Sequence, residues 1–216
     1  MNTDFARLQM VNQQVRGWNV YDETVLDMLR TLPRERFVTE GFESFAFADT
    51  EIPIGHGQHM MSPTIEGRLL QALGLTGDEK VLEIGTGSGF MTACLARLAA
   101  HVTSIDIFDD FLESAAKRLD SCGISNVQLH EMDAMRELPE ADFDAIAVTG
   151  SVQNFDPRFV EILKPRGRLF IVEGDAPAME AKLVQRLDGT DWHTVSLFET
   201  TLAPLVHGAL PPQFAF

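Results

Sequence analysis

The spacing of apolar positions along the chain changes near residue 80. In residues 4–16 and 22–32 apolar side chains recur at helical spacing, and Gly17 and Pro33 follow these segments as breaks. From residue 80 onward the apolar positions gather instead in short runs rich in Val and Ile, with helix-like segments between them. The pattern therefore predicts an N-terminal helical cap followed by alternating strands and helices.

Five such runs predict strands: "KVLEIG", "HVTSIDI", "VQLHEMD", "FDAIAVTG" and "GRLFIVEG". The segments expected to be helical are "GFMTACLARLA", "FDDFLESAAKRLDSCG" and "PRFVEILKPRG". The tail predicts two further strands around the turn at Asp188 and Gly189. Because strands that alternate with helices form right-handed crossovers, we expect an α/β fold with a doubly wound, mostly parallel sheet.

No linker divides the chain, so we expect a single domain over residues 1–216. Within it, residues 1–62 would form the helical cap and a loop, and residues 63–216 the α/β core. The loop "GHGQHMMSP" at 55–63 has the composition of neither a helix nor a strand, and Pro63 is suited to the first turn of the helix that follows.

Composition narrows the classes of partner. The formal net charge of −15 argues against nucleic acid, whose phosphates favour clustered Lys and Arg. No apolar run is long enough to span a membrane and no signal peptide is evident, so we expect a cytoplasmic protein. Cys94 and Cys122 are expected to be reduced thiols, and the six His form no cluster typical of a metal site.

The candidate chemistry lies at three predicted strand ends. Gly85, Gly87 and Gly89 follow the first strand of the α/β region and open a helix, where glycines permit a tight turn and a close approach of a ligand. Asp106 ends the next strand, where a carboxylate can bind both hydroxyls of an adenosine ribose, and Asp133 ends the third. These residues predict a nucleotide-like ligand at the carboxyl edge of the sheet.

The glycine spacing distinguishes between nucleotide classes. A dinucleotide site usually has G-x-G-x-x-G, whereas this chain has G-x-G-x-G with Glu83 inside the preceding strand, and no Gly-Lys-Ser/Thr of a phosphate loop follows. This pattern resembles S-adenosylmethionine-dependent methyltransferases, and an acidic residue suits a cofactor with a sulfonium and an ammonium group. A nicotinamide-dependent oxidoreductase is the less favoured alternative.

A narrower resemblance rests on "IPIGHGQ", "SPT", "VLEIGTGSGF" and "LKPRGRL" taken together. From about Val11 to Val172 the chain resembles the protein-L-isoaspartate O-methyltransferase family. The resemblance implies a seven-stranded doubly wound sheet, S-adenosylmethionine as the methyl donor, and the carboxylate of an isoaspartyl residue in a damaged protein as the acceptor.

Site residues follow from matching positions. Gly85 and Gly87 would lie under the methionine part of the cofactor, Asp106 would bind the ribose, and Asp133 would face the adenine. The whole cofactor-binding set that the resemblance implies is Met61, Glu83, Gly85, Thr86, Gly87, Asp106, Ile107, Asp133, Ala134 and Thr149.

The loop departs from the family pattern, because the family's active-site serine falls on Met61 and its threonine on His59. A carboxylate acceptor is already a nucleophile at pH 7, so the residues around it need only position it. We expect Gln58 and Ser62 to donate hydrogen bonds and His59 to supply charge as the catalytic set. Two alternatives stay open: a relative with another acceptor, and a cofactor-binding protein without isoaspartyl activity. The sequence does not predict the oligomeric state.

Overall fold

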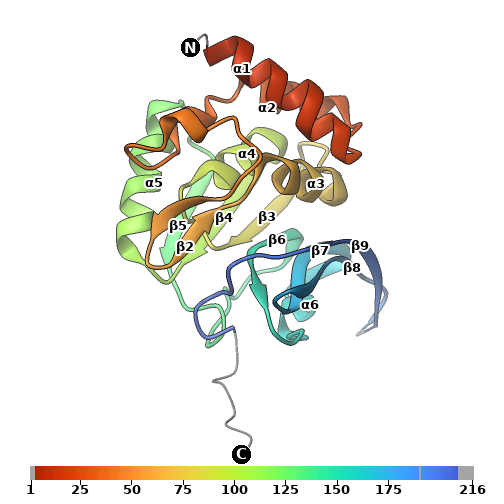
Figure 1. Cartoon of the computed structure of the whole chain (residues 1–216). Coiled ribbons are helices and arrows are strands. Elements are labelled where there is room, and N and C mark those ends of the chain that lie inside the picture. The colour runs from red at the N-terminus through yellow and green to blue at the C-terminus, as the bar shows by residue number, and fades with distance from the viewer. Residues whose placement is uncertain (1–2, 190, 209–216) are drawn as a thin grey trace, which may run out of the picture.

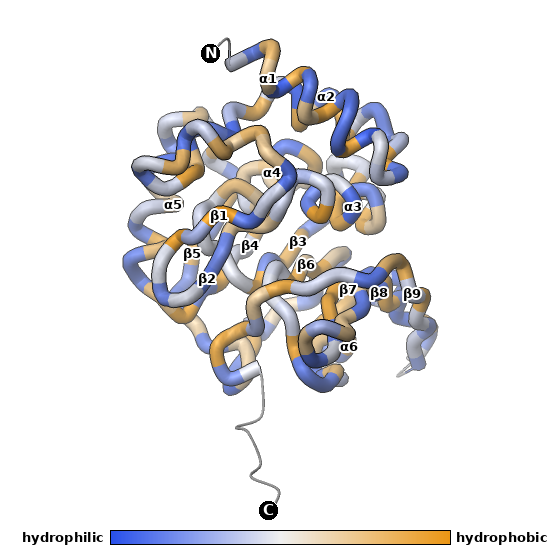
Figure 2. Tube along the Cα trace, viewed as in Figure 1, coloured by the Kyte–Doolittle hydropathy of each residue, from blue (hydrophilic) through white to orange (hydrophobic). Residues whose placement is uncertain are grey.

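The computed structural model describes residues 3–189 and 191–208 (Figure 1). The cap starts with helix α1 (Thr3–Gln9), which continues through a π-helical turn (Met10–Val15) and a 3-10 turn (Arg16–Trp18). Helix α2 (Glu23–Thr31) begins at Asp22, whose carboxylate accepts from the backbone N–H groups of Thr24 and Val25. Both predicted cap helices are therefore present, and Figure 2 shows hydrophilic and hydrophobic residues alternating along α2.

Two 3-10 turns (Arg34–Arg36 and Glu43–Phe45) lead to an antiparallel hairpin of β1 (Ile52–Gly55) and β2 (Gln58–Met60). The expectation of an irregular loop was thus wrong for residues 55–60. The hairpin closes because Gly55, His56 and Gly57 all adopt positive φ, at 109°, 49° and 71°.

Helix α3 (Pro63–Leu73) precedes a seven-stranded sheet of order β5-β4-β3-β6-β7-β8-β9. The five parallel strands are β3 (Lys80–Ile84), β4 (His101–Asp106), β5 (Val127–Glu131), β6 (Phe143–Val152) and β7 (Leu163–Asp175). The tail adds β8 (Ala178–Arg186) and β9 (Trp192–Thr200), each antiparallel to its neighbour. The predicted fold class is confirmed, including the two tail strands.

Alternate residues of the central strands enter two different cores, as expected for strands covered on both faces. On β6, Ala145 and Ala147 pack with the cap, α3 and α4 (Phe90–Leu98), while Ile146 and Val148 face the opposite cluster. Helix α5 (Asp109–Ser121) joins β4 to β5. The second face carries α6, which spans only Arg158–Glu161. The longer predicted helix "PRFVEILKPRG" was wrong, because Leu163 already begins β7.

The C-terminal segment after β9 returns to the sheet beside the end of β6. Ser151 donates its backbone N–H to Ala203 O at 3.0 Å, and Leu205 N donates to Ser151 O at 2.9 Å. These bonds bring residues 203–206 to the carboxyl edge of the parallel strands, where the predicted ligand site lies.

Candidate active site

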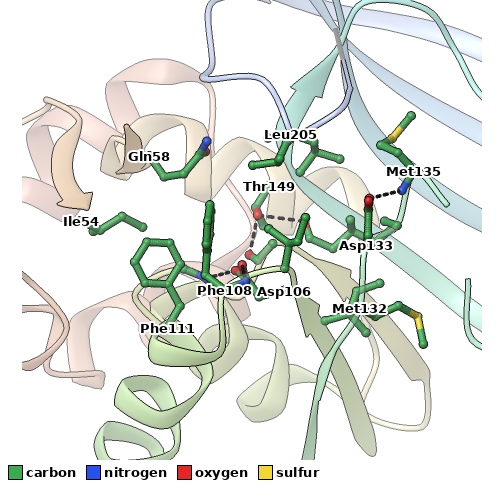
Figure 3. A pocket seen from close by; sticks show the side chains of 18 of the residues that line it. Ile54, Gln58, Asp106, Phe108, Phe111, Met132, Asp133, Met135, Thr149 and Leu205 are labelled. Atoms are coloured by element: carbon green, nitrogen blue, oxygen red, sulfur yellow. Dashed lines mark hydrogen bonds between the residues drawn. The ribbon is translucent and has the colours of Figure 1, made fainter. Parts of the chain in front are cut away.

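A cavity of about 580 Å³ opens at the carboxyl edge of the parallel strands, between the sheet, the β1–β2 hairpin and the C-terminal segment (Figure 3). We call this the outer compartment. A smaller space of about 300 Å³, the inner compartment, adjoins it toward the helical cap. Both are lined by Ile54, His59, Gly85, Gly87 and Thr149, so they form one continuous site.

The glycine turn forms the floor shared by the two compartments. Gly85 has φ of 97°, and a Cβ there would overlap Thr149 Oγ1, which lies 2.6 Å from the Gly85 carbonyl oxygen. Gly87 has φ of 49°, and a Cβ there would stand 3.0 Å from Ile54 Cδ1. Backbone conformation therefore favours glycine at both positions, and at Gly85 lack of space adds to it.

Asp106 lies at the end of β4 and lines the outer compartment. Its Oδ2 accepts from Gly87 N at 2.9 Å and its Oδ1 from Phe108 N at 3.0 Å. Burial raises the pKa of this carboxyl above its ordinary 3.8, and the backbone N–H of Gly87 opposes the shift. Since each carboxylate oxygen can accept more than one hydrogen bond, Asp106 keeps acceptor capacity for a ligand.

Asp133 follows β5 and faces the same compartment, with Ile107 and Ala134 beside it. Met135 N donates to Asp133 Oδ1 at 3.0 Å, while His207 Nδ1 and Arg136 Nε lie 2.8 and 3.0 Å from Oδ2. Asp133 is therefore fixed by its own turn and by the C-terminal segment. This second contact could not be read from the sequence.

Glu83 lines neither compartment, although the sequence placed it in the cofactor-binding set. It is completely buried in β3, where its Oε2 accepts from Thr92 Oγ1 and Ser104 Oγ, both at 2.5 Å. Ser104 in turn lies 2.6 Å from Thr86 Oγ1 in the glycine turn. Burial raises the pKa of Glu83 to about 8. Glu83 thus supports the turn from behind, and only Thr86 of this network reaches the inner compartment.

The loop residues divide into two groups. Gln58 and the exposed His59 line the outer compartment, and Gln58 Nε2 reaches Pro204 O at 3.4 Å. Met61 is buried and lines the inner compartment. Ser62 lines neither: it stands at the start of α3, and its hydroxyl lies 3.2 Å from Thr64 Oγ1. The structure therefore brings Gln58, His59 and Met61 to the cavity and leaves Ser62 outside it.

Several lining residues were not anticipated. Ile54, Phe108, Phe111, Leu205 and Val206 close the outer compartment, and Glu66, Ser88 and Met91 belong to the inner one. Phe108 could have been found, because it comes two residues after Asp106 at a strand end. Leu205 and Val206 could not, since only the return of the chain after β9 brings them there.

Within residues 3–189 and 191–208, no group of three or more His, Cys, Asp or Glu is placed to hold a metal ion. None of the helices in these ranges has the length and apolar character needed to cross a bilayer.

A largely parallel sheet with a glycine turn after β3, an aspartate at the end of β4 and another after β5 is typical of the Rossmann-like fold of methyltransferases. The model of the family "Protein-L-isoaspartate(D-aspartate) O-methyltransferase" matches residues 7–209. The chain therefore belongs to the protein-L-isoaspartate O-methyltransferase family, as the sequence motifs indicated.

Individual relatives agree with this assignment. A protein-L-isoaspartate O-methyltransferase from Opitutus terrae is 41% identical over 185 residues, covering 85% of this chain and 79% of the relative. One from Brucella anthropi is 36% identical over 208 residues, covering 95% of each. A crystal structure assigned to the same family from Plasmodium falciparum, in complex with S-adenosyl-L-homocysteine, has a TM-score of 0.79 at 17% identity, over 92% of this chain and 97% of that one. At that identity the structural match shows the fold.

Proposed function

We propose that this chain transfers the methyl group of S-adenosylmethionine to the carboxylate of isoaspartyl residues in damaged proteins. The observation that carries the proposal is the continuous cavity at the sheet edge, where Asp106 and the glycine turn line one wall and the loop that departs from the family pattern lines the other. Family membership supplies the reaction class and the acceptor.

The residues present fit the methyl donor. Asp106 is a largely buried carboxylate with spare acceptor capacity, as a ribose with two hydroxyl groups requires. Asp133 and Ala134 would hold the adenine, with Ile107 against its ring. Gly85, Thr86, Gly87, Thr149 and Met61 would enclose the methionine part, and Glu83 would act through Thr86. When bound, the donor supplies a methyl group on a positively charged sulfur.

The hairpin would position the acceptor. An acceptor carboxylate is ionised at pH 7, so the chain needs to orient it and exclude water, and needs no base to remove a proton. Gln58 and His59 line the outer compartment and can donate hydrogen bonds to carboxylate oxygens. Ser62 would need a movement of the start of α3 to join them, so we assign its hydroxyl the smallest part.

Two further sequence predictions remain part of the proposal. The packing of cap residues Val11 and Leu26 in one core with Phe170 of the sheet supports a single domain over 1–216. Cys94 and Cys122 are both free thiols, which fits the expected cytoplasmic location.

The test measures methyl transfer from labelled S-adenosylmethionine to an isoaspartyl peptide, with the matching aspartyl peptide as control. We expect transfer to the isoaspartyl peptide alone. If the protein binds S-adenosylhomocysteine but transfer stays at background, the acceptor is a different one. The Met61→Ser variant then asks whether the missing hydroxyl is the cause, because it places a donor where Met61 now lines the inner compartment.

A further inference from the structure

The inner compartment contains a carboxylate that the proposed reaction leaves unexplained. Glu66 lies in the first turn of α3, is only 1% exposed, and lines the compartment together with Met60, Met61 and Met91. Burying an ionisable group beside three thioether side chains is costly unless the group has a partner or a task.

Arg34 is the partner, and it holds Glu66 from outside the compartment. The guanidinium donates through Nη1 to Glu66 Oε2, through Nη2 to Met61 O at 2.7 Å, and through Nε to Ala46 O at 2.8 Å. Its carbon Cζ also stands 4.8 Å from the centroid of the Phe90 ring. Arg34 lines neither compartment, so this arrangement fixes the carboxylate while leaving one side of it toward the cavity.

The second oxygen of Glu66 is available to a ligand. No described residue donates a hydrogen bond to Oε1 in addition to the Arg34 bond at Oε2. Asp49 adds a second negative charge nearby, and its Oδ1 accepts from Thr64 Oγ1 at 2.7 Å. Arg34 bonds to Oε2 only, so a cationic ligand group at Oε1 would add a second charge-assisted hydrogen bond to the same carboxylate.

The position of the compartment identifies that group. On the proposed function, Asp106 and Asp133 would bind the nucleoside in the outer compartment, and the amino-acid end of the donor would extend over the glycine turn into the inner one. We propose that Glu66 is a cofactor-recognition residue, whose Oε1 accepts a charge-assisted hydrogen bond from the α-ammonium group of the donor. This inference rests on the proposed use of S-adenosylmethionine and deepens it.

Calorimetry on the full chain tests the inference with two ligands that share the nucleoside and the thioether. S-adenosylhomocysteine carries the α-ammonium group, whereas 5′-methylthioadenosine lacks the amino-acid end. The Glu66→Gln variant should weaken binding of S-adenosylhomocysteine by roughly 10- to 100-fold, the magnitude of a lost hydrogen bond to a charged group. Binding of methylthioadenosine should change by less than about threefold. This ligand keeps the nucleoside and the thioether, and neither of these groups would reach Glu66.

The matched control is Asp49→Asn, which removes the neighbouring charge and keeps an acceptor for Thr64. This variant should weaken the binding of S-adenosylhomocysteine by less than about threefold, since Asp49 does not line the compartment. Should Glu66→Gln fail to fold, the double variant Arg34→Met with Glu66→Met replaces the buried pair by apolar side chains of similar size. It should show the same selective loss.

If Glu66→Gln weakens the binding of both ligands equally, Glu66 only supports the fold. Unchanged binding of S-adenosylhomocysteine to this variant would also overturn the inference. These outcomes leave the proposed function intact, because the acceptor takes no part in the measurement. If the unmodified chain binds neither ligand, the cofactor assignment itself fails, and this inference fails with it. A third outcome separates the two proposals. If Glu66→Gln selectively loses S-adenosylhomocysteine binding while the unmodified chain does not methylate an isoaspartyl peptide, the role of Glu66 is supported and the proposed acceptor is refuted.

Discussion

The two walls of the cavity are held in place by different kinds of polar interaction. On the sheet side, Glu83 joins the strands to the glycine turn through hydroxyl groups, and no cationic side chain among the described residues pairs with it. On the cap side, Arg34 joins Glu66 to two backbone carbonyls of the chain before α3.

The difference follows from the backbone. In the sheet wall, ladder hydrogen bonds between β3, β4 and β6 already fix the geometry, so a neutral carboxyl and three hydroxyls suffice. The cap wall consists of turns and a two-stranded hairpin, and the backbone hydrogen bonds within residues 32–50 are local, joining residues two or three positions apart. A guanidinium with several donors in a fixed plane can tie such segments together where a hydroxyl could not.

The largest expected effect concerns the sheet wall. Asp106→Asn should weaken binding of S-adenosylhomocysteine by about 100-fold, because a buried carboxylate that accepts from Gly87 and would accept from the ribose is replaced by a weaker acceptor. Calorimetry measures the change. The control Asp109→Asn lies three residues away on the exposed start of α5 and should bind normally. Equal affinities for the two variants would remove Asp106 from the site.

The same contrast explains how far the sequence could predict the site. Gly85, Asp106 and Asp133 line the cavity, and the sequence could bring them together because parallel strands end at one edge and a strand end is visible in the apolar pattern. Glu83 stands in the same motif but points into the core, since alternate residues of a strand face opposite sides. The motif alone did not give that direction.

The cap wall was less predictable. Glu66 and Arg34 are 32 residues apart and belong to no motif, and their pairing depends on how the turns after α2 pack against α3. The hairpin at 52–60 was likewise missed, because its turn relies on positive φ at His56, a conformation that glycine usually supplies. Long-range packing of irregular segments leaves little trace in the apolar spacing.

The buried carboxyl of Glu83 in the sheet wall should make the stability of the fold depend on pH. Burial raises the pKa of Glu83 from its ordinary 4.5 to about 8, so between these values the folded chain holds a proton that the unfolded chain has released. Stability contributed by this proton is present at low pH and is lost as pH rises toward 8. The free energy of unfolding should therefore fall with pH by at most about 1.4 kcal/mol per unit from this group.

Glu83→Gln should flatten this dependence, because the amide keeps an acceptor for Thr92 and Ser104 and does not ionise. Denaturant unfolding at pH 6, 7 and 8 measures it, with the exposed Glu113→Gln as the control that retains the full slope. A weaker dependence should remain in the variant below pH 7, since burial also raises the pKa of Glu66, to about 7. An identical slope in both variants would mean that Glu83 is ionised in the folded chain.

The smallest expected effect concerns the contact between the two walls at the hairpin tip. His56 stacks on Phe108, with ring centroids 4.0 Å apart at 8°, and its Nε2 lies 2.9 Å from Asp110 Oδ2. Since Phe108 lines the outer compartment, His56→Ala should loosen the hairpin and raise the dissociation rate of S-adenosylhomocysteine by about three- to tenfold. Stopped-flow displacement measures the rate. Asp110→Asn keeps the stacked ring and removes only the exposed carboxylate beside His56 Nε2, so it should have less than half of that effect. If His56→Ala and the unmodified chain release the ligand at the same rate, the hairpin does not limit ligand exit, and the sheet wall alone retains the cofactor.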